Sequence, residues 1–344
     1  MKRILSILFL LILLVGLLTA FTLYKSIYTP NINPDKENLI LEIPSPSSFQ
    51  DVYTILKDSS LLIDTVSFFR VAKLMKYDKA DVPSGKYQLK ENWNNKQLIG
   101  NLRSGNQIPV KVTFNNVRTV DELAGKITSY VEMDSIELLQ TLKSDQTLNE
   151  LGLNQENLLT LFIPNSYNLY WNESADKLIR RMKTENDNFW TKNDRLAKAE
   201  ALGMTKEEVY TLASIVEKES IRNKEKPIIA GVYLNRLKRG MMLQADPTVV
   251  FAVDDFSIRR VLLKHLAIDS PYNTYKNVGL PPGPIYMPSI KSIDAVLSPQ
   301  AHDYLYFCAK PGYNSEHQFA ETVREHERNA DKYRSWLNEE RIRK

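Results

Sequence analysis

The chain has 344 residues, of which 43% are hydrophobic and 25% charged, a composition typical of a folded protein of about two domains with appended segments. Its net charge of +4 is small for this length and argues against a nucleic-acid-binding protein, which usually carries a dense basic patch. Cys308 is the only cysteine, which excludes an intrachain disulfide and a cysteine-based zinc site.

The N-terminus carries an uncharged apolar run from Ile4 to about Tyr24, directly after Lys2 and Arg3. About 20 such residues are enough to span a bilayer. A cleavable signal peptide is the alternative, but it would have a shorter apolar region and a small-residue cleavage site. We therefore expect residues 1–25 to be an uncleaved anchor. The basic start places the N-terminus in the cytoplasm and the remaining chain outside.

Residues 26–118 are expected to contain a linker and a small mixed module. Pro30 and Pro34 indicate an extended linker over residues 26–38. In the module, residues 39–118, alternation and helical periodicity predict three strands and three helices. The strands are expected at 39–43, 84–89 and 109–114, and the helices from 49 through 56, at 63–75 and at 95–102. Periodicity alone does not distinguish this module from an arbitrary α+β spacer.

Residues 119–344 are expected to form a larger mixed α/β domain. Helices are predicted at 120–130, 135–142, 154–161, 175–201, 206 past 220, and 226–239, the last ended by Gly240 as a C-cap, with Asp246–Pro247 as a turn or helix start. The helix at 175–201 is long and amphipathic, with a solvated basic face. A buried strand is predicted at 304–308, and residues 316–320 precede a charged helix that runs to Lys344.

Two segments of this domain are candidates for the wall of a ligand cleft. The aromatic segment 162–171 could stack on sugar rings, although such residues more often form core. Residues 279–285, which follow the segment 271–275, are rigid and turn-rich and contain few residues that could build a core. They could form a cleft wall or a structural corner.

The stretch T-L-A-S-I-V-E-K-E-S, residues 211–220, places acidic side chains where a helix usually buries apolar ones. Thr205 and Glu208 match a capping box at the start of this helix. An apolar stripe then follows at 3.6-residue spacing, formed by Val209, Leu212, Ala213, Val216 and Ser220.

The two glutamates of this stretch have different positions on the helix. Glu219 lies about 60° from the centre of the stripe, and Glu217 lies about 100° away on the other side. They therefore cannot act as a facing pair. Glu219 is the more buried of the two, and burial raises the pKa of a carboxyl group, as a general acid requires. The alternative is a glutamate that is solvated or salt-bridged at the helix edge.

Other catalytic patterns are weak or absent. The sequence has no glycine-rich phosphate loop, no Gly-x-Ser-x-Gly and no His-Glu-x-x-His. His317, Glu321 and His326 do not match a strong metal-binding spacing, so no metal is predicted. Ser214 and Lys218 are four residues apart on a helix, but an ordinary structural pair is the simpler interpretation than a catalytic dyad.

The order of motifs resembles the endolytic murein transglycosylase family (MltG, YceG-like) over essentially the whole chain. The resemblance rests on the segments 212–220, 235–237 with Gly240 and Met241, 243–249, 272–275, 279–284 and 304–307. The chain departs from the family pattern at Asn165–Ser166, at Asn115–Asn116 and at Met287–Pro288–Ser289. These departures affect details of the substrate subsites.

The resemblance implies a fold and a set of site residues. The fold class is α+β, with an N-terminal transmembrane helix, a LysM-like glycan-binding module at 39–118 and a transglycosylase domain at 119–344. Glu219 is the implied catalytic acid/base, and Glu217 and Ser220 are supporting residues. The expected substrate contacts are Gln244, Asp246, Tyr272, Asn273 and Tyr275.

The resemblance also implies a single-pass inner-membrane enzyme that acts on nascent peptidoglycan in the periplasm without a cofactor. The expected partners are glycan strands, the membrane and the wall-synthesis machinery, not nucleic acid. Two alternatives remain open. A hydrolytic muramidase would use a second carboxylate, and a non-catalytic wall-binding scaffold would bind glycan without releasing products.

Overall fold

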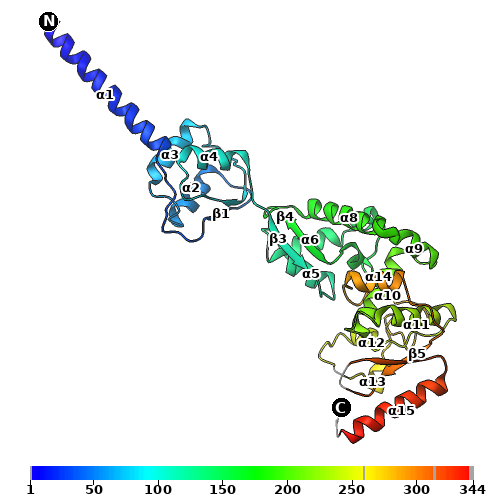
Figure 1. The fold of residues 1–344 in the computed structure, drawn as a ribbon. Helices are drawn as coiled ribbons and strands as arrows, with labels where there is room; N and C mark the ends of the chain where they lie inside the picture. The colour runs from blue at the N-terminus through cyan, green and yellow to red at the C-terminus, as the bar shows by residue number, and fades with distance from the viewer. Residues whose placement is uncertain (1, 259, 313–314, 341–344) are drawn as a thin grey trace. The chain divides into compact units, whose positions relative to one another are not determined.

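The computed structural model describes residues 2–258, 260–312 and 315–340. Contacts divide the chain into two compact units (Figure 1). The N-terminal unit comprises Met1–Val112, Tyr130–Met133 and Asn168–Ser174, and the C-terminal unit comprises Thr113–Ser129, Asp134–Tyr167 and Ala175–Lys344. Helices and short strands make up both, so the fold is mixed α/β, as predicted. The domain limits predicted from the sequence remain predictions.

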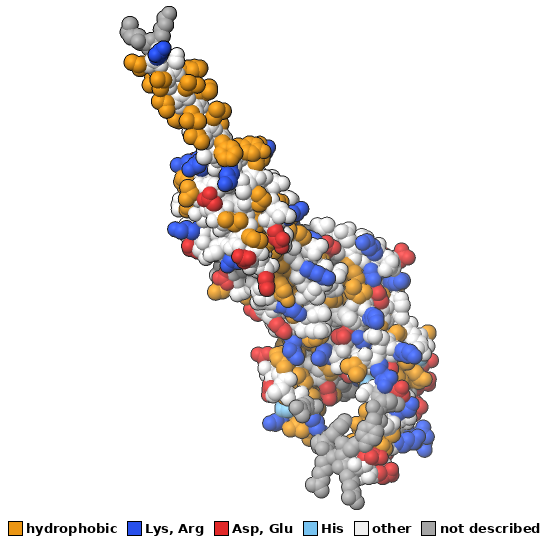
Figure 2. Space-filling model, turned by 60° about the vertical axis from the view of Figure 1, so that its left-hand side comes forward, with side chains coloured by type: hydrophobic (Ala, Val, Ile, Leu, Met, Phe, Trp, Pro, Cys, Tyr) orange, Lys and Arg blue, Asp and Glu red, His pale blue; other side chains and the backbone are white. Residues whose placement is uncertain are grey.

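The first element is the long apolar helix α1 (Lys2–Tyr28), which by length and composition could cross a membrane. Its apolar side chains cover the exposed helix surface in Figure 2. The last turn of α1 instead packs against its own unit. Ile27 contacts the hydrophobic core, and the Asn95 Nδ2 donates a hydrogen bond of 2.8 Å to the Ser26 carbonyl oxygen. The Lys96 Nζ lies 5.5 Å from the centre of the Tyr28 ring.

The rest of the N-terminal unit forms one hydrophobic core. Its elements are β1 (Ile40–Ile43), α2 (Phe49–Asp58), α3 (Thr65–Leu74), β2 (Gly85–Gln88) and α4 (Asn95–Ser104). β1 and β2 pair antiparallel, with Ile43 opposite Gly85, and α2 and α3 connect them along the chain. The stretch predicted as a linker also joins this core, because Ile32 is 1% exposed and Asn31 donates a 2.9 Å hydrogen bond to the Asp64 carbonyl oxygen.

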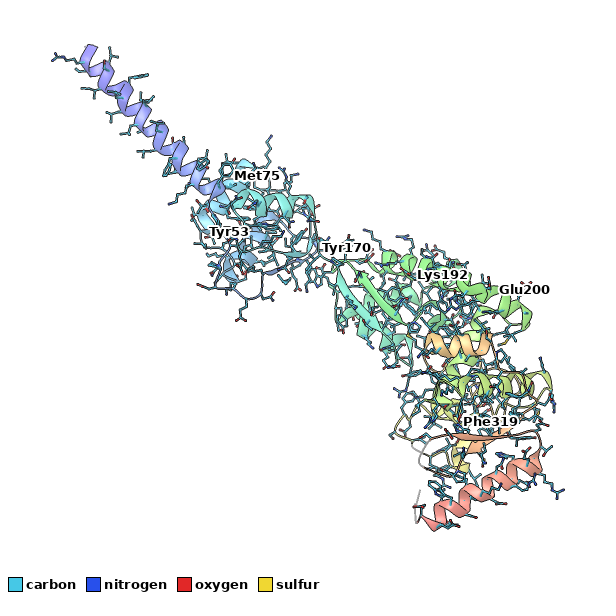
Figure 3. The ribbon with its side chains drawn as sticks, in the orientation of Figure 1. Tyr53, Met75, Tyr170, Lys192, Glu200 and Phe319 are labelled. Carbon is cyan, nitrogen blue, oxygen red and sulfur yellow. The ribbon has the colours of Figure 1, made fainter. Side chains whose placement is uncertain are left out.

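The boundary between the two units falls within two strands, β3 (Val110–Phe114) and β4 (Asn165–Leu169). These strands pair with each other. Part of the aromatic segment 162–171 is core, as one alternative predicted. Phe162 is fully buried and Tyr167 is 5% exposed, whereas Tyr170 is 53% exposed and is labelled in Figure 3.

The described C-terminal unit is mostly helical. Its helices are α5 (Val120–Thr128), α6 (Ser135–Leu142), α7 (Asp145–Leu151), the 3₁₀ helix η1 (Leu158–Leu161), α8 (Ala175–Thr191), η2 (Lys192–Asp194), α9 (Arg195–Ala201), α10 (Lys206–Glu219), α11 (Lys226–Lys238), α12 (Asp246–Val253), α13 (Leu263–Leu266), α14 (Ile290–Leu297) and α15 (Val323–Glu339). An antiparallel pair, β5 (Tyr306–Ala309) and β6 (His317–Ala320), precedes α15. Phe319 on β6, labelled in Figure 3, packs against Phe307 at 6.0 Å between ring centres.

The centre of this unit is α10, which contacts α9, α11, α12 and α14. Thr205 and Glu208 form the predicted capping box at its start. Every residue from Val209 to Val216 is buried, so the apolar stripe predicted from periodicity is only part of a helix enclosed on all sides. α11 ends at Lys238 with Arg239 as its C-cap, one residue before the predicted Gly240, which takes a left-handed φ of 63° that favours glycine.

Several elements differ from their predictions. The helix expected at 154–161 is reduced to η1, and α7 was not predicted. The single helix expected at 175–201 breaks near Lys192 (Figure 3), where Asn193 and Asp194 have φ values of 58° and 55°. Its basic face is not wholly solvated, since Arg195 is 6% exposed and forms a 2.8 Å ion pair with Asp294. The strand expected to be buried at 304–308 is the half-buried β5.

Candidate active site

Glu219 is the last residue of α10. The helix was expected to continue past Ser220, but Ser220 has φ −142° and ψ 133°, an extended conformation, and its backbone N–H bonds to the Val216 carbonyl oxygen. Ending the helix here leaves the Glu219 side chain at the rim of the packed core and beside open space. The C-terminal end of a helix also carries partial negative charge, which disfavours an ionised carboxylate.

The Glu219 carboxyl group is partly buried and receives one strong hydrogen bond. The Tyr233 hydroxyl on α11 donates to the Glu219 Oε1 at 2.6 Å. Burial raises the pKa of Glu219 from 4.5 to about 7; the Tyr233 hydrogen bond opposes this, the Asp246 charge adds to it and the Arg236 charge opposes it. Glu219 therefore keeps its proton near neutral pH in a substantial fraction of molecules.

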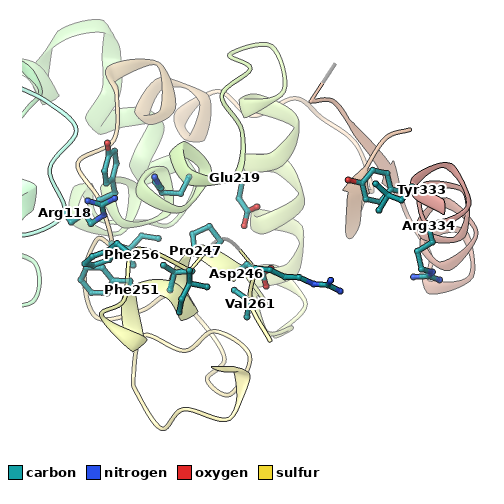
Figure 4. Close-up of a pocket in the computed structure, with 16 residues that line it drawn as sticks. Arg118, Glu219, Asp246, Pro247, Phe251, Phe256, Val261, Tyr333 and Arg334 are labelled. Atoms are coloured by element: carbon teal, nitrogen blue, oxygen red, sulfur yellow. The ribbon is translucent and has the colours of Figure 1, made fainter. Parts of the chain in front are cut away.

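Three cavities meet at Glu219. The aromatic cavity, about 1000 Å³, is lined by residues that include Glu219, Asp246, Phe251, Phe256 and Tyr286. The inner cavity, about 380 Å³, lies between Glu219, Tyr275 and Tyr306. The α15 cavity, about 570 Å³, is lined by Glu219, His317 and Trp336. In Figure 4 the carboxylate of Glu219 points toward Asp246, with Arg118 and Phe256 at one end of the aromatic cavity and Tyr333 and Arg334 at the other.

Three of the five predicted substrate-contacting residues line these cavities. Asp246, the first residue of α12, faces both the aromatic and the inner cavity. The Tyr275 hydroxyl donates a 2.6 Å hydrogen bond to the Asp246 Oδ1. Gln244 lines the inner cavity with a φ of 52°, and its backbone N–H bonds to the Thr274 carbonyl oxygen at 3.0 Å. These side chains are therefore near Glu219, although they come from a different segment.

The structure does not place the other two beside Glu219. Asn273 is fully buried, and its Nδ2 donates to the carbonyl oxygens of Leu266 and Ile268, so it shapes the loop. Tyr272 lines none of the three cavities and packs against Phe251, with 4.8 Å between ring centres. Both residues were expected from the motif at 272–275 that carries the family resemblance, and a motif does not fix the direction of each loop side chain.

Glu217 is oriented away from this site and connects α10 to α14. Its Oε2 accepts hydrogen bonds from the Lys226 Nζ at 2.9 Å and from the Ser289 and Ser292 hydroxyls, each at 2.6 Å. Burial opposes ionisation here, but the hydrogen bonds from Ser289, Ser292 and Lys226 lower the pKa below its ordinary value. Glu217 is thus ionised and internally paired.

Ser220, the other predicted supporting residue, fixes the chain that follows Glu219. Its hydroxyl donates to the Glu225 Oε2 at 3.0 Å and accepts from the Arg222 backbone N–H at 3.1 Å. Glu225 also accepts from the His317 backbone N–H at 2.8 Å and lies 2.9 Å from the His317 Nδ1. His317 is therefore held by a carboxylate from another segment rather than by Glu321 and His326.

Ser214 and Lys218 do not form a dyad. The buried Ser214 hydroxyl donates to the Thr211 carbonyl oxygen at 2.6 Å and accepts from the Ile285 backbone N–H at 3.0 Å. The Lys218 Nζ lies 4.6 Å from the centre of the Tyr286 ring. Each group thus has its own separate contacts.

Two residues of the site were not predicted, Tyr233 and Arg236. Arg236 is 7% exposed, and its guanidinium group donates to the carbonyl oxygens of Leu305 and Leu243 at 2.7 and 2.8 Å. It therefore holds the segment before Asp246 in place. The available signal was the predicted helix at 226–239, in which Tyr233 and Arg236 are three residues apart and therefore lie on one face.

This arrangement can carry out proton-transfer chemistry. It combines a carboxyl group with a pKa near 7, a phenol that orients it and a second carboxylate, Asp246, in connected cavities. Phe251, Phe256 and Tyr286 give the largest cavity apolar ring faces of the kind that stack on sugars. A carboxylic acid that is protonated at neutral pH is suited to protonate a leaving group.

Comparisons with known proteins agree with one another. A YceG-like family model matches residues 41–332. An endolytic murein transglycosylase of Bacillus subtilis is 31% identical over 337 residues, covering 93% of this chain and 91% of the relative. One from Streptococcus pneumoniae R6 is 27% identical, covering 88% of this chain and 60% of the relative. The crystal structure of a YceG-like protein from Listeria monocytogenes matches with a TM-score of 0.57 and 30% identity, covering 86% of this chain and 99% of that one.

Proposed function

Because this chain belongs to the YceG-like family, whose relatives above are named endolytic murein transglycosylases, we propose that it cleaves peptidoglycan glycan strands internally. The observation that carries the proposal is Glu219, a partly buried carboxyl group with a pKa of about 7 at the junction of three cavities. The bond cleaved is the glycosidic bond from N-acetylmuramic acid to N-acetylglucosamine.

The proposed reaction uses Glu219 first as an acid and then as a base. Protonated Glu219 donates its proton to the glycosidic oxygen, and the bond from the muramic C1 to that oxygen breaks. The resulting carboxylate removes the proton from the muramic C6 hydroxyl, whose oxygen bonds to C1. The products are a 1,6-anhydro-muramic end and a free N-acetylglucosamine hydroxyl. Glu219 ends protonated, and no water is consumed.

The neighbouring groups have distinct roles in this scheme. Tyr233 orients the Glu219 carboxyl group through its 2.6 Å hydrogen bond. The Asp246 charge and burial favour the protonated acid before cleavage. Gln244, Asp246 and Tyr275 line the cavity in which the sugar hydroxyls would bind.

A hydrolytic muramidase remains the second candidate, and Asp246 is the observation that favours it. Hydrolytic glycosidases use two carboxyl groups, one of which activates water or attacks the sugar. Asp246 lines two of the same cavities as Glu219. Mass spectrometry of the products separates the two reactions, because a 1,6-anhydro end is lighter than a reducing end by one water molecule.

The test of the proposal is the Glu219→Gln variant on purified sacculi. Glutamine keeps the size of the side chain but cannot donate the required proton, so anhydro-product release should fall by about 10²- to 10⁴-fold. Glu200→Gln, an exposed change on α9, is the matched control and should retain activity. Unchanged cleavage by Glu219→Gln would assign the acid elsewhere. A wild-type protein that binds sacculi and releases nothing would instead support the scaffold alternative.

We also propose the cellular arrangement expected from the sequence. α1 would anchor the protein in the cytoplasmic membrane with its basic end inside and the two units outside, and Lys2–Arg3 before the apolar run supports this orientation. The module at 39–118 would bind glycan in the manner of a LysM domain. Its support is the chain order β1, α2, α3, β2, with β1 and β2 paired antiparallel.

A further inference from the structure

Four cationic side chains line the aromatic cavity together with Glu219, namely Arg118, Lys218, Arg260 and Arg334. Arg334 is paired with Asp331, whereas Arg118 and Lys218 interact with each other. Arg118 precedes α5, and Lys218 is the residue before Glu219 on α10. Both line the aromatic cavity (Figure 4 labels Arg118). Neither has a role in the cleavage scheme, since the charged groups that act on Glu219 most strongly are Asp246 and Arg236.

Each of these two cations is placed over an aromatic ring. The Arg118 guanidinium carbon lies 4.4 Å from the centre of the Phe256 ring, and the Lys218 Nζ lies 4.6 Å from that of Tyr286. Such stacking holds the charged groups in position without neutralising them. Both side chains line the aromatic cavity, where their N–H groups could donate to a bound anion.

No described acidic side chain forms an ion pair with either cation. The carboxyl groups of this region have other partners. Asp246 and Glu219, which line the same cavity, accept hydrogen bonds from the Tyr275 and Tyr233 hydroxyls. Glu217 accepts from Lys226, Ser289 and Ser292, and the Glu122 Oε2 accepts the Arg118 backbone N–H at 2.8 Å.

The two cations repel each other. Burial lowers the pKa of Lys218 below its ordinary value, and the Arg118 charge lowers it further, with partial compensation from Glu217. Two like charges that are near each other and form no ion pair with a described acidic side chain are stabilised when an anion binds between them.

We propose that Arg118 and Lys218 form a subsite for a carboxylate of the stem peptide that muramic acid carries. The inference rests on the proposed function and specifies its substrate. The sugar rings of the strand are uncharged, so its carboxylates lie on the lactyl arm of muramic acid or on the attached peptide. An intact stem converts the lactyl carboxyl into an amide, which leaves the peptide carboxylates as the anions available. Binding one of them beside Glu219 would select strands that still carry peptides and would fix which bond reaches the acid.

The test compares three soluble, uncrosslinked strand preparations on the full-length chain in detergent. The first carries stems with free carboxylates, the second has those carboxylates converted to methylamides, and the third has its stems removed by an amidase, which exposes the lactyl carboxylate. Dissociation constants are measured in the Glu219→Gln background, so that binding is read without turnover. This readout is independent of whether the chain cleaves glycan.

The Glu219→Gln protein should bind the strands with free stem carboxylates about tenfold more tightly than the methylamide strands. Arg118→Gln with Lys218→Gln should abolish that preference, and Arg118→Lys with Lys218→Arg should retain most of it. The matched control is Lys177→Gln with Arg180→Gln, which removes the same charges from the exposed face of α8 and should leave the preference unchanged. The preference should also weaken as salt concentration rises.

Three results would overturn the proposal. The first is equal affinity for the free-carboxylate and methylamide strands. The second is an equal loss of affinity for both in the Arg118→Gln, Lys218→Gln variant. The third is a loss of affinity in that variant confined to the amidase-treated strands, which would assign the subsite to the lactyl carboxylate. Cleavage by the wild-type chain without a stem preference would refute the subsite alone. A stem preference without any cleavage would support the subsite and refute the proposed reaction.

Discussion

At the scale of single residues, the protonation of Glu219 depends on opposing neighbours. Burial and the Asp246 charge raise its pKa, while the Tyr233 hydrogen bond and the Arg236 charge lower it, and the result is about 7. Because this value lies above 4.5, folding favours the protonated form. The stabilisation linked to this group is complete below about pH 4.5 and is lost as the pH rises through about 7. Activity that needs the proton should decline over the upper part of the same range.

Replacing Tyr233 with phenylalanine tests this balance. The change removes a hydrogen bond that favours the carboxylate, so the pKa of Glu219 should rise. The basic limb of the pH profile of kcat should therefore shift to higher pH by about one unit. The ring contact with Phe307, at 5.9 Å, is retained. The measurement is the pH dependence of anhydro-product release, with Tyr170→Phe, which changes an exposed tyrosine, as control. A shift to lower pH would contradict the account of this carboxyl group.

The sequence pointed to Glu219 as the proposed acid, but not to the groups that shift its pKa. Glu219 was identified from its place beside the apolar stripe and from the family resemblance, and Asp246 and Tyr275 line the same cavities. Tyr233 could not be assigned, because its contact depends on how α11 packs against α10, a tertiary feature that periodicity does not encode.

At the scale of elements, α10 is held at both ends by side-chain hydrogen bonds. The Thr205 capping box fixes its start, and Glu217 connects its last turn to the first turn of α14 through Ser289 and Ser292. Lys226 on α11 pairs with the same carboxylate, and its side chain is only 4% exposed. Glu217 therefore links α10, α11 and α14 next to the proposed acid.

Replacing Glu217 with alanine should destabilise the C-terminal unit. The change leaves a buried ammonium group without its counter-charge and two serine hydroxyls without their acceptor, which costs about 3 kcal/mol. The free energy of unfolding in urea, followed by tryptophan fluorescence, measures this loss. Glu200→Ala, an exposed change on α9, should alter that free energy by less than about 0.5 kcal/mol. Equal effects of the two changes would show that Glu217 has no structural role.

Secondary structure was predictable where local signals agree, and less so where conformation depends on single residues. Capping and apolar spacing located α2, α4, α10 and α11 within a few residues. The break between α8 and α9 was not predicted, because two consecutive non-glycine residues adopt left-handed φ values there. Such a turn is uncommon and depends on tertiary contacts, among them the ion pair of Arg195 with Asp294.

At the scale of the whole molecule, α1 is a candidate anchor joined to an enzyme-like body. Deleting residues 2–24 should release the protein from the membrane fraction, because it removes the apolar run and leaves the turn that packs on the N-terminal unit. The soluble product should cleave dissolved strands with unchanged kcat, since the cavities at Glu219 belong to the C-terminal unit. Fractionation and product analysis measure the two outcomes. Membrane association that persists after the deletion would refute an anchor formed by α1 alone.

The packing of the final turn of α1 limits how this helix can move. Ser26 is hydrogen-bonded to Asn95, and Ile27 packs against the hydrophobic core, so the helix is joined rigidly to the rest of the first unit. If α1 spans a membrane, as proposed, the first unit would turn with the helix whenever it rotates or tilts in the lipid. The helix would then fix the orientation of that unit relative to the bilayer instead of acting as a flexible tether.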